Sequence, residues 1–115
     1  MTTYSLRLQE KYFNFIKSGT KRIELRLFDE KRRAIQVGDE IVFSKNNDDG
    51  ERLHAKVVEL LKYPTFKDLF ADYDIEILAD KSMTKDELLA ALNEFYPEDK
   101  QNEYNVVGIR FELAL

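Results

Sequence analysis

A predicted hairpin between residues 37 and 61 limits the possible folds more than any other feature of the sequence. Two strand-like segments, VGDEIVFS and RLHAKVVELL, flank the motif NNDDGE, which is a strong signal for a tight turn. Two segments joined by such a turn pair as antiparallel strands. The chain is therefore expected to contain a sheet that is at least partly antiparallel.

Three further segments alternate between apolar and polar residues, as strands do. They are TYSLRL near the start, RIELRLF at residues 22–28, and NVVGIRFEL at the end. In the first of them, alternation places Tyr4, Leu6 and Leu8 on one side. Together with the hairpin, the pattern predicts five strands.

Helical spacing of apolar residues appears in three segments, QEKYFNFIKSG, TFKDLFADY and TKDELLAALNEFY. Gly19 fits a left-handed helix terminator, and Thr65 is a candidate N-cap. Thr84 and Glu87 have the spacing of a capping box. The last helix is expected to bury a stripe of Leu88, Ala91, Leu92 and Phe95 and to end at Pro97.

The predicted order is β-α-β-β-β-α-α-β. Long strands joined by hairpins, with helices at the ends, favour an α+β fold built on a small curled or closed sheet over a doubly wound parallel sheet. At 115 residues, 43% of them hydrophobic, the chain is expected to form one domain spanning residues 1–115.

The composition excludes several classes of function. No cysteine occurs, which rules out disulfides, thiolate metal sites and a cysteine nucleophile. With His54 as the single histidine, the usual metal sites of two or three histidines are excluded. Carboxylate-only binding of a hard cation stays open, but no loop has calcium-ligand spacing, so we expect no metal site and no cofactor. Residues 1–20 lack the apolar run of a signal peptide, and no stretch could span a membrane. We expect a cytoplasmic protein with no membrane partner.

The charge distribution is uneven. The net charge is −4, yet residues 17–33 hold seven basic side chains against three acidic ones, so this segment carries +4 and the rest of the chain −8. Such asymmetry indicates one face that receives an anion and another that repels it. The alternative is that both faces are simply solvated surface.

The basic segment can be interpreted through its strand period. Ile23, Leu25 and Leu27 are expected to face the core. Arg22, Glu24 and Arg26 are expected to line the opposite, polar face, with Lys21 at the strand entry beside a cleft. Arginine binds phosphate through a planar fork and lysine as a point charge. A solvated strand face remains the alternative.

Aromatic and polar residues elsewhere are weaker candidates. One of Tyr12 and Phe13 could stack on a base, although two core aromatics are the simpler outcome. Tyr104 precedes the final strand, where ligand contact and an ordinary turn explain it equally well. His54 is expected to be solvated or singly hydrogen-bonded.

Several linked motifs resemble the ASCH domain, a PUA-like family of small β-barrels. The matching pieces are the Leu-x-Leu strand, SGTK, IELRL, DEKRR, VGDEIVF, YPTFKDLF and YNVVGIRFEL. The resemblance implies a barrel of five or six strands, a cleft beside the Gly-x-Lys segment, and binding of RNA or a nucleotide. The residues expected to contact nucleic acid are Lys21, Arg26, Lys31, Arg32, Arg33, Tyr12 and Tyr104.

One branch of this family, which the chain also resembles, removes the acetyl group from N4-acetylcytidine. Its catalytic lysine falls on Lys21. Its threonine falls on Glu24, and its later glutamate falls near Lys81, with Asp80 beside it, so two of the three positions differ. If the chain is a hydrolase, acting on a modified nucleoside or on RNA, Lys21 would polarise the scissile group and Glu24 would serve as the base.

Overall fold

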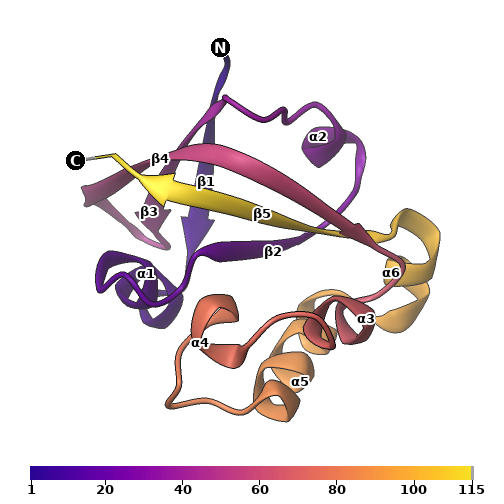
Figure 1. Ribbon diagram of the computed structural model, residues 1–115. Helices are drawn as coiled ribbons and strands as arrows, with labels where there is room; N and C mark the ends of the chain where they lie inside the picture. Colours follow the sequence, from indigo (N-terminus) through magenta and orange to yellow (C-terminus); the bar gives the residue numbers. More distant parts are fainter. Residues whose placement is uncertain (115) are drawn as a thin grey trace.

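The computed structural model describes residues 1–114 apart from the side chain of Asp49, and five strands form one sheet (Figure 1). The strands are β1 (Thr3–Leu8), β2 (Ile23–Leu27), β3 (Glu40–Lys45), β4 (Asp48–Tyr63) and β5 (Val106–Leu113). All five segments predicted as strands are strands. The hairpin between β3 and β4 is also confirmed, and its turn is at Asn46 and Asn47, with Asn47 at φ 62°.

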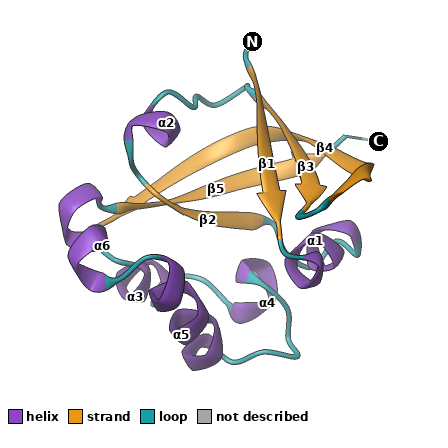
Figure 2. Cartoon of the chain, turned by 180° about the vertical axis from the view of Figure 1, so that it is seen from behind, coloured by secondary structure: helices purple, strands orange, loops and turns teal. Residues whose placement is uncertain are grey.

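The spatial order of the strands is β1-β3-β4-β5-β2. β1 runs parallel to β3, and every other neighbouring pair is antiparallel. The sheet curls, so its two edge strands approach each other and the tip of β1 lies beside β2 in both views (Figures 1 and 2). The Arg26 guanidinium on β2 crosses this gap and donates to the Arg7 carbonyl on β1 at 3.0 Å. We call the line where β1 and β2 meet the seam.

The helices are α1 (Glu10–Lys17), α2 (Glu30–Arg33), α3 (Phe66–Phe70), α4 (Ile75–Leu78), α5 (Lys85–Phe95) and α6 (Glu98–Tyr104). Three of them, α1, α3 and α5, were predicted. The capping box of Thr84 and Glu87 is present, and Gly19 ends α1 at φ 90°. The predicted element order was incomplete, because α2, α4 and α6 have only four to seven residues and no long apolar stripe.

Two hydrophobic clusters lie on the two faces of the sheet. One fills the inside of the curl, where Phe13 and Ile16 of α1 pack with Phe43 and Ile109. The other lies where α3, α4 and α5 cover the opposite face below β2 (Figure 1). β2 contributes Ile23 and Leu25 to this second cluster, as its alternation predicted. Because neighbouring residues of a strand point to opposite faces, Glu24 points back toward the seam.

None of the helices in residues 1–114 is long and apolar enough to cross a membrane.

Candidate functional site

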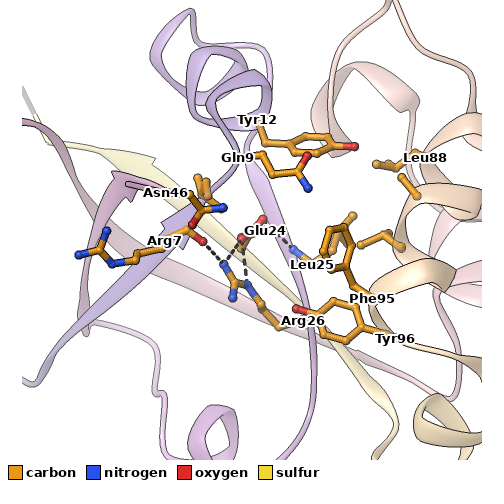
Figure 3. Close-up of a pocket in the computed structure, with 13 residues that line it drawn as sticks. Arg7, Gln9, Tyr12, Glu24, Leu25, Arg26, Asn46, Leu88, Phe95 and Tyr96 are labelled. Carbon is orange, nitrogen blue, oxygen red and sulfur yellow. Dashed lines mark hydrogen bonds and ion pairs between the residues drawn. The ribbon is translucent and has the colours of Figure 1, made fainter. Parts of the chain in front are cut away.

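A pocket of about 200 Å³ lies at the seam, between β1, β2, α1 and α5 (Figure 3). Its walls are mostly apolar, with Leu88, Ala91 and Leu92 contributed by α5. Aromatic rings come from Tyr12, Phe95 and Tyr96, and the polar lining comes from Arg7, Gln9, Glu24, Arg26 and Asn46. A mostly apolar cavity with a few converging polar groups is the usual form of a small-ligand site.

Glu24 forms the charged floor of this pocket, and its side chain is only 6% exposed. One carboxylate oxygen, Oε2, accepts hydrogen bonds from Nε and Nη2 of Arg26 at 3.0 and 2.8 Å. The other, Oε1, accepts from the Leu25 amide at 3.1 Å. Burial alone would raise the pKa of Glu24, but Arg26 and Lys21 outweigh it and hold the pKa below its ordinary value. Glu24 is therefore ionised at neutral pH.

Lys21 lies behind Glu24 and does not line the pocket. Its ammonium donates to the carbonyl oxygens of Ile23 at 2.5 Å and Leu78 at 2.7 Å, and it lies 3.5 Å from Oε1 of Glu24. Burial lowers the pKa of Lys21, and the Glu24 carboxylate opposes that shift. The sequence placed Lys21 beside an open cleft, whereas its side chain is 2% exposed. The reason is that α4 closes over the strand entry and supplies the Leu78 carbonyl.

Arg26 joins three parts of the site. Besides its two bonds to Glu24, it closes the seam through the Arg7 carbonyl, and its side chain remains 13% exposed. Burial would lower the pKa of Arg26, but the Glu24 carboxylate raises it above its ordinary value. The guanidinium is thus a fixed cation at the pocket wall, held in place on two sides.

Aromatic rings stand on both sides of this charged floor. Figure 3 shows Tyr12 on one side of Glu24, with Tyr96 and Phe95 on the other. Phe95 was expected in the buried stripe of its helix, but it is 62% exposed. Of that stripe, Leu88 is buried and the Ala91 and Leu92 side chains border the pocket. The expectation failed for Phe95 because this residue, at the end of α5, lines the open pocket and does not pack in the core.

A second groove, of about 450 Å³, adjoins the pocket and shares Arg7 and Arg26 with it. Lys31 and Arg32 of α2 supply its other cations, so we call it the α2 groove. Arg32 is held by Asp29 at 2.8 Å, while Lys31 is exposed and has no ion pair within residues 1–114. Two of the cations predicted in the DEKRR segment therefore lie next to the pocket.

Two predicted contact residues are not brought into this arrangement. Arg33 donates to the Phe28 carbonyl and lies over the Phe28 ring at 4.6 Å, outside the residues that line either cavity. Tyr104 ends α6 and lies 6.0 Å from the Lys100 ammonium, also outside both linings. Within the described residues, no group of three or more histidine, cysteine, aspartate or glutamate side chains could hold a metal ion.

Sequence reasoning missed five polar or aromatic lining residues, Arg7, Gln9, Asn46, Phe95 and Tyr96. Gln9 directly follows β1, and Asn46 begins the turn between β3 and β4. The position of Gln9 at a strand end was a usable signal, because such positions often face ligands. Asn46 was interpreted only as a turn residue, and nothing local shows that this turn reaches the seam.

Comparisons with known proteins identify relatives of the whole chain. The ASCH domain family model matches residues 6–114. The crystal structure of the hypothetical protein PH0355 is 35% identical, with a TM-score of 0.86 over 98% of this chain and 100% of its own. Protein PF0455 from Pyrococcus furiosus is 32% identical, with a TM-score of 0.77 over 97% of each chain.

A more distant likeness is to a mutant form of ZmASCH from Zymomonas mobilis. It is 11% identical, with a TM-score of 0.61, over 94% of this chain and 66% of that one. At this identity the likeness concerns the fold alone. The curated proteins gave no significant match.

Proposed function

Because the chain belongs to the ASCH domain family, which is PUA-like and associated with RNA binding, we propose that it binds single-stranded RNA and admits one base into the seam pocket. The observation that carries the proposal is the pocket itself, with aromatic rings around a fixed Glu24–Arg26 pair and cations next to its mouth.

The size of the pocket supports a single base. Sites for drug-sized ligands usually span about 300–1,000 Å³, and this pocket, at about 200 Å³, is smaller. Tyr12, Phe95 and Tyr96 can stack on any base, since every base has a π-face. Gln9 and Asn46 are exposed amides at the pocket, and such side chains can donate to and accept from a base edge.

The surrounding charge supports a nucleotide over an uncharged planar ligand. A base that enters the pocket leaves its sugar and phosphate outside, and the α2 groove offers Lys31 and Arg32 there. Guanidinium and ammonium groups both bind phosphate, the guanidinium through a bidentate fork. Recognition of an unstacked base together with its backbone is the usual way that proteins bind single-stranded RNA.

A matched pair of variants tests this proposal. Ala91→Phe fills the pocket without changing any charge, whereas Ala90→Phe adds the same ring to an exposed neighbouring position of α5. We expect Ala91→Phe to abolish most binding of a fluorescent single-stranded RNA of about five nucleotides, and Ala90→Phe to bind as the wild type does. Equal affinity of the two variants for the RNA would exclude the pocket as the base site.

Hydrolysis of an acylated nucleoside such as N4-acetylcytidine is the second candidate, favoured by one observation. Lys21 and Glu24 form a buried pair with 3.5 Å between Nζ and Oε1. Two features weigh against it: both Glu24 oxygens already accept hydrogen bonds, and the Lys21 ammonium donates to two carbonyl groups away from the pocket. Chromatography of N4-acetylcytidine after incubation with the protein tests this candidate. Release of cytidine by the wild type would favour it, provided that Glu24→Gln, assayed below its own melting temperature, releases none.

A further inference from the structure

The outer face of the sheet carries a third cavity, which the proposed base site does not use. It has a volume of about 420 Å³ and lies over β1, β3 and β4, on the side opposite the interior of the curl. Its lining is Ser5, Arg7, Val42, Ser44, Arg52 and His54. We call it the outer groove.

The strand register arranges these side chains in two rows. Arg7 lies opposite Ser44, and Ser44 lies opposite Arg52, so one row contains a hydroxyl between two arginines. In the next row, Val42 lies between Ser5 on β1 and His54 on β4. Neighbouring strands are about 4.8 Å apart, so the two arginine backbones stand about 10 Å apart across Ser44. Two long side chains at that spacing can reach the same phosphate or two neighbouring ones.

The two arginines of the outer groove differ in their contacts, because Arg7 already donates from Nη1 to the Lys45 carbonyl at 3.4 Å. Arg52 is exposed and has no ion pair with another described residue, and none of the described residues that line the cavity is a carboxylate. Glu40 lies at its border, 3.5 Å from Nδ1 of His54. Arg52 differs in this from Lys17, which pairs with Glu51, and from Arg110, which pairs with Glu59. An arginine pair around a hydroxyl is a suitable receptor for an anion that carries several acceptor oxygens.

Arg7 connects the outer groove to the base site. The same residue lines the seam pocket, the α2 groove and the outer groove, and its carbonyl is the one that Arg26 holds. A polyanion that enters at the seam can therefore continue over the end of β1 onto the outer face without leaving basic surface.

We infer that the outer groove binds the phosphate backbone of the RNA strand whose base occupies the seam pocket. This inference rests on the proposed function and extends it. The site becomes longer than one nucleotide, and the RNA strand follows a path around the edge of β1. Single-stranded sites of other small β-barrels commonly cover about 4–16 nucleotides, so a path of this kind is of ordinary length.

The test compares two ligands on three proteins. The ligands are a mononucleotide, which fits the pocket alone, and a single-stranded RNA of about ten nucleotides, which can also cover the outer groove. The proteins are the wild type, Arg52→Ala in the outer groove, and Lys67→Ala, which removes an exposed cation of α3. Affinity is measured over a series of salt concentrations, and melting temperatures show that each variant is folded.

We expect Arg52→Ala to leave the affinity for the mononucleotide unchanged and to weaken binding of the longer RNA. The slope of log K against log salt should become shallower by about 0.7 for each phosphate that the variant no longer neutralises. Lys67→Ala should match the wild type with both ligands.

Three outcomes would overturn the inference. If the wild type binds RNA but Arg52→Ala has the same affinity and slope, the outer groove carries no phosphate, and the seam pocket still stands. If Lys67→Ala weakens binding of the longer RNA as much as Arg52→Ala does, the effect comes from the net charge of the protein and not from the outer groove. With polyglutamate added as a control ligand, tight binding to the wild type that is lost in Arg52→Ala would assign the groove to an acidic protein partner instead. Failure of the wild type to bind either nucleic acid would refute the proposed function itself.

Discussion

Replacing Glu24 with glutamine should remove much of the stability of this protein, although the two side chains have the same shape. The carboxylate accepts two hydrogen bonds from Arg26 and one from the Leu25 amide, and it lies 3.5 Å from the Lys21 ammonium. Neutralising it leaves two cations at the seam with side chains only 2% and 13% exposed. Glutamine must also direct an NH₂ group at positions that now hold donors.

The magnitude follows from the burial of these groups. Removing one partner of a buried ion pair costs about 3–5 kcal/mol, because the remaining charge stays uncompensated. A domain of this size typically has about 5–15 kcal/mol of stability in total. For about a hundred residues, each kcal/mol lowers the melting temperature by roughly 4 °C, so we expect a decrease of about 12–20 °C.

Differential scanning calorimetry or thermal circular dichroism measures this decrease, and the chain offers a matched control. Glu59 pairs with Arg110 at 3.6 Å on the surface, with side chains about half exposed. Glu59→Gln should change stability by less than about 1 kcal/mol, as is usual for exposed pairs. Melting temperatures within a few degrees of each other for the two variants would refute the reasoning that Glu24 holds the seam together.

Three further predictions follow from the same contacts. Folding lowers the pKa of Glu24, so its contribution to stability is complete above its ordinary pKa of about 4.5 and is lost as the pH falls through the folded value. In urea denaturation, the free energy of unfolding should therefore fall more steeply with acid for the wild type than for Glu24→Gln. Gly108→Ala should destabilise the fold by about 1–3 kcal/mol in urea titrations. The reason is that an added Cβ would lie 2.9 Å from the Ile23 side chain and 3.0 Å from that of Leu69. Unchanged stability would mean that β2 and α3 can move apart there. In fluorescence titrations, Tyr12→Ala should weaken RNA binding by about 1–3 kcal/mol, the usual range for one base stacked on an aromatic ring. Tyr12→Phe keeps the ring and should bind nearly as the wild type does. Equal losses of affinity for both variants would assign the effect to the hydroxyl.

The sequence predicted the strands well because their pattern is local. Alternation in TYSLRL and RIELRLF depends only on which face of each strand is buried, and both strands bury the expected residues, such as Leu6 and Ile23. The capping box of α5 is equally local, and it was found at Thr84. The short helices α2 and α6 are not specified in this way, because each is polar and held by its neighbours.

The sequence predicted some residues of the candidate site but not how they are brought together, as Glu24 illustrates. Alternation placed this residue on the face opposite Ile23, which is correct, but it could not show that this face meets β1 and α5 at the seam. A polar strand face was therefore expected to be open, whereas Glu24 is buried and paired. Phe95 shows the converse: it has the helical spacing of a core residue, but spacing cannot reveal that it lines an open pocket.

The central claim, that one base enters the seam pocket, is tested most directly by nuclear magnetic resonance. A two-dimensional amide spectrum of the ¹⁵N-labelled protein is recorded while a mononucleotide is added. We predict the largest shifts at pocket-lining residues from separate parts of the chain, which are Gln9, Tyr12, Leu25, Asn46 and Tyr96. Shifts confined to Lys31 and Arg32, with the pocket amides unmoved, would show that only phosphate is bound and would contradict the claim.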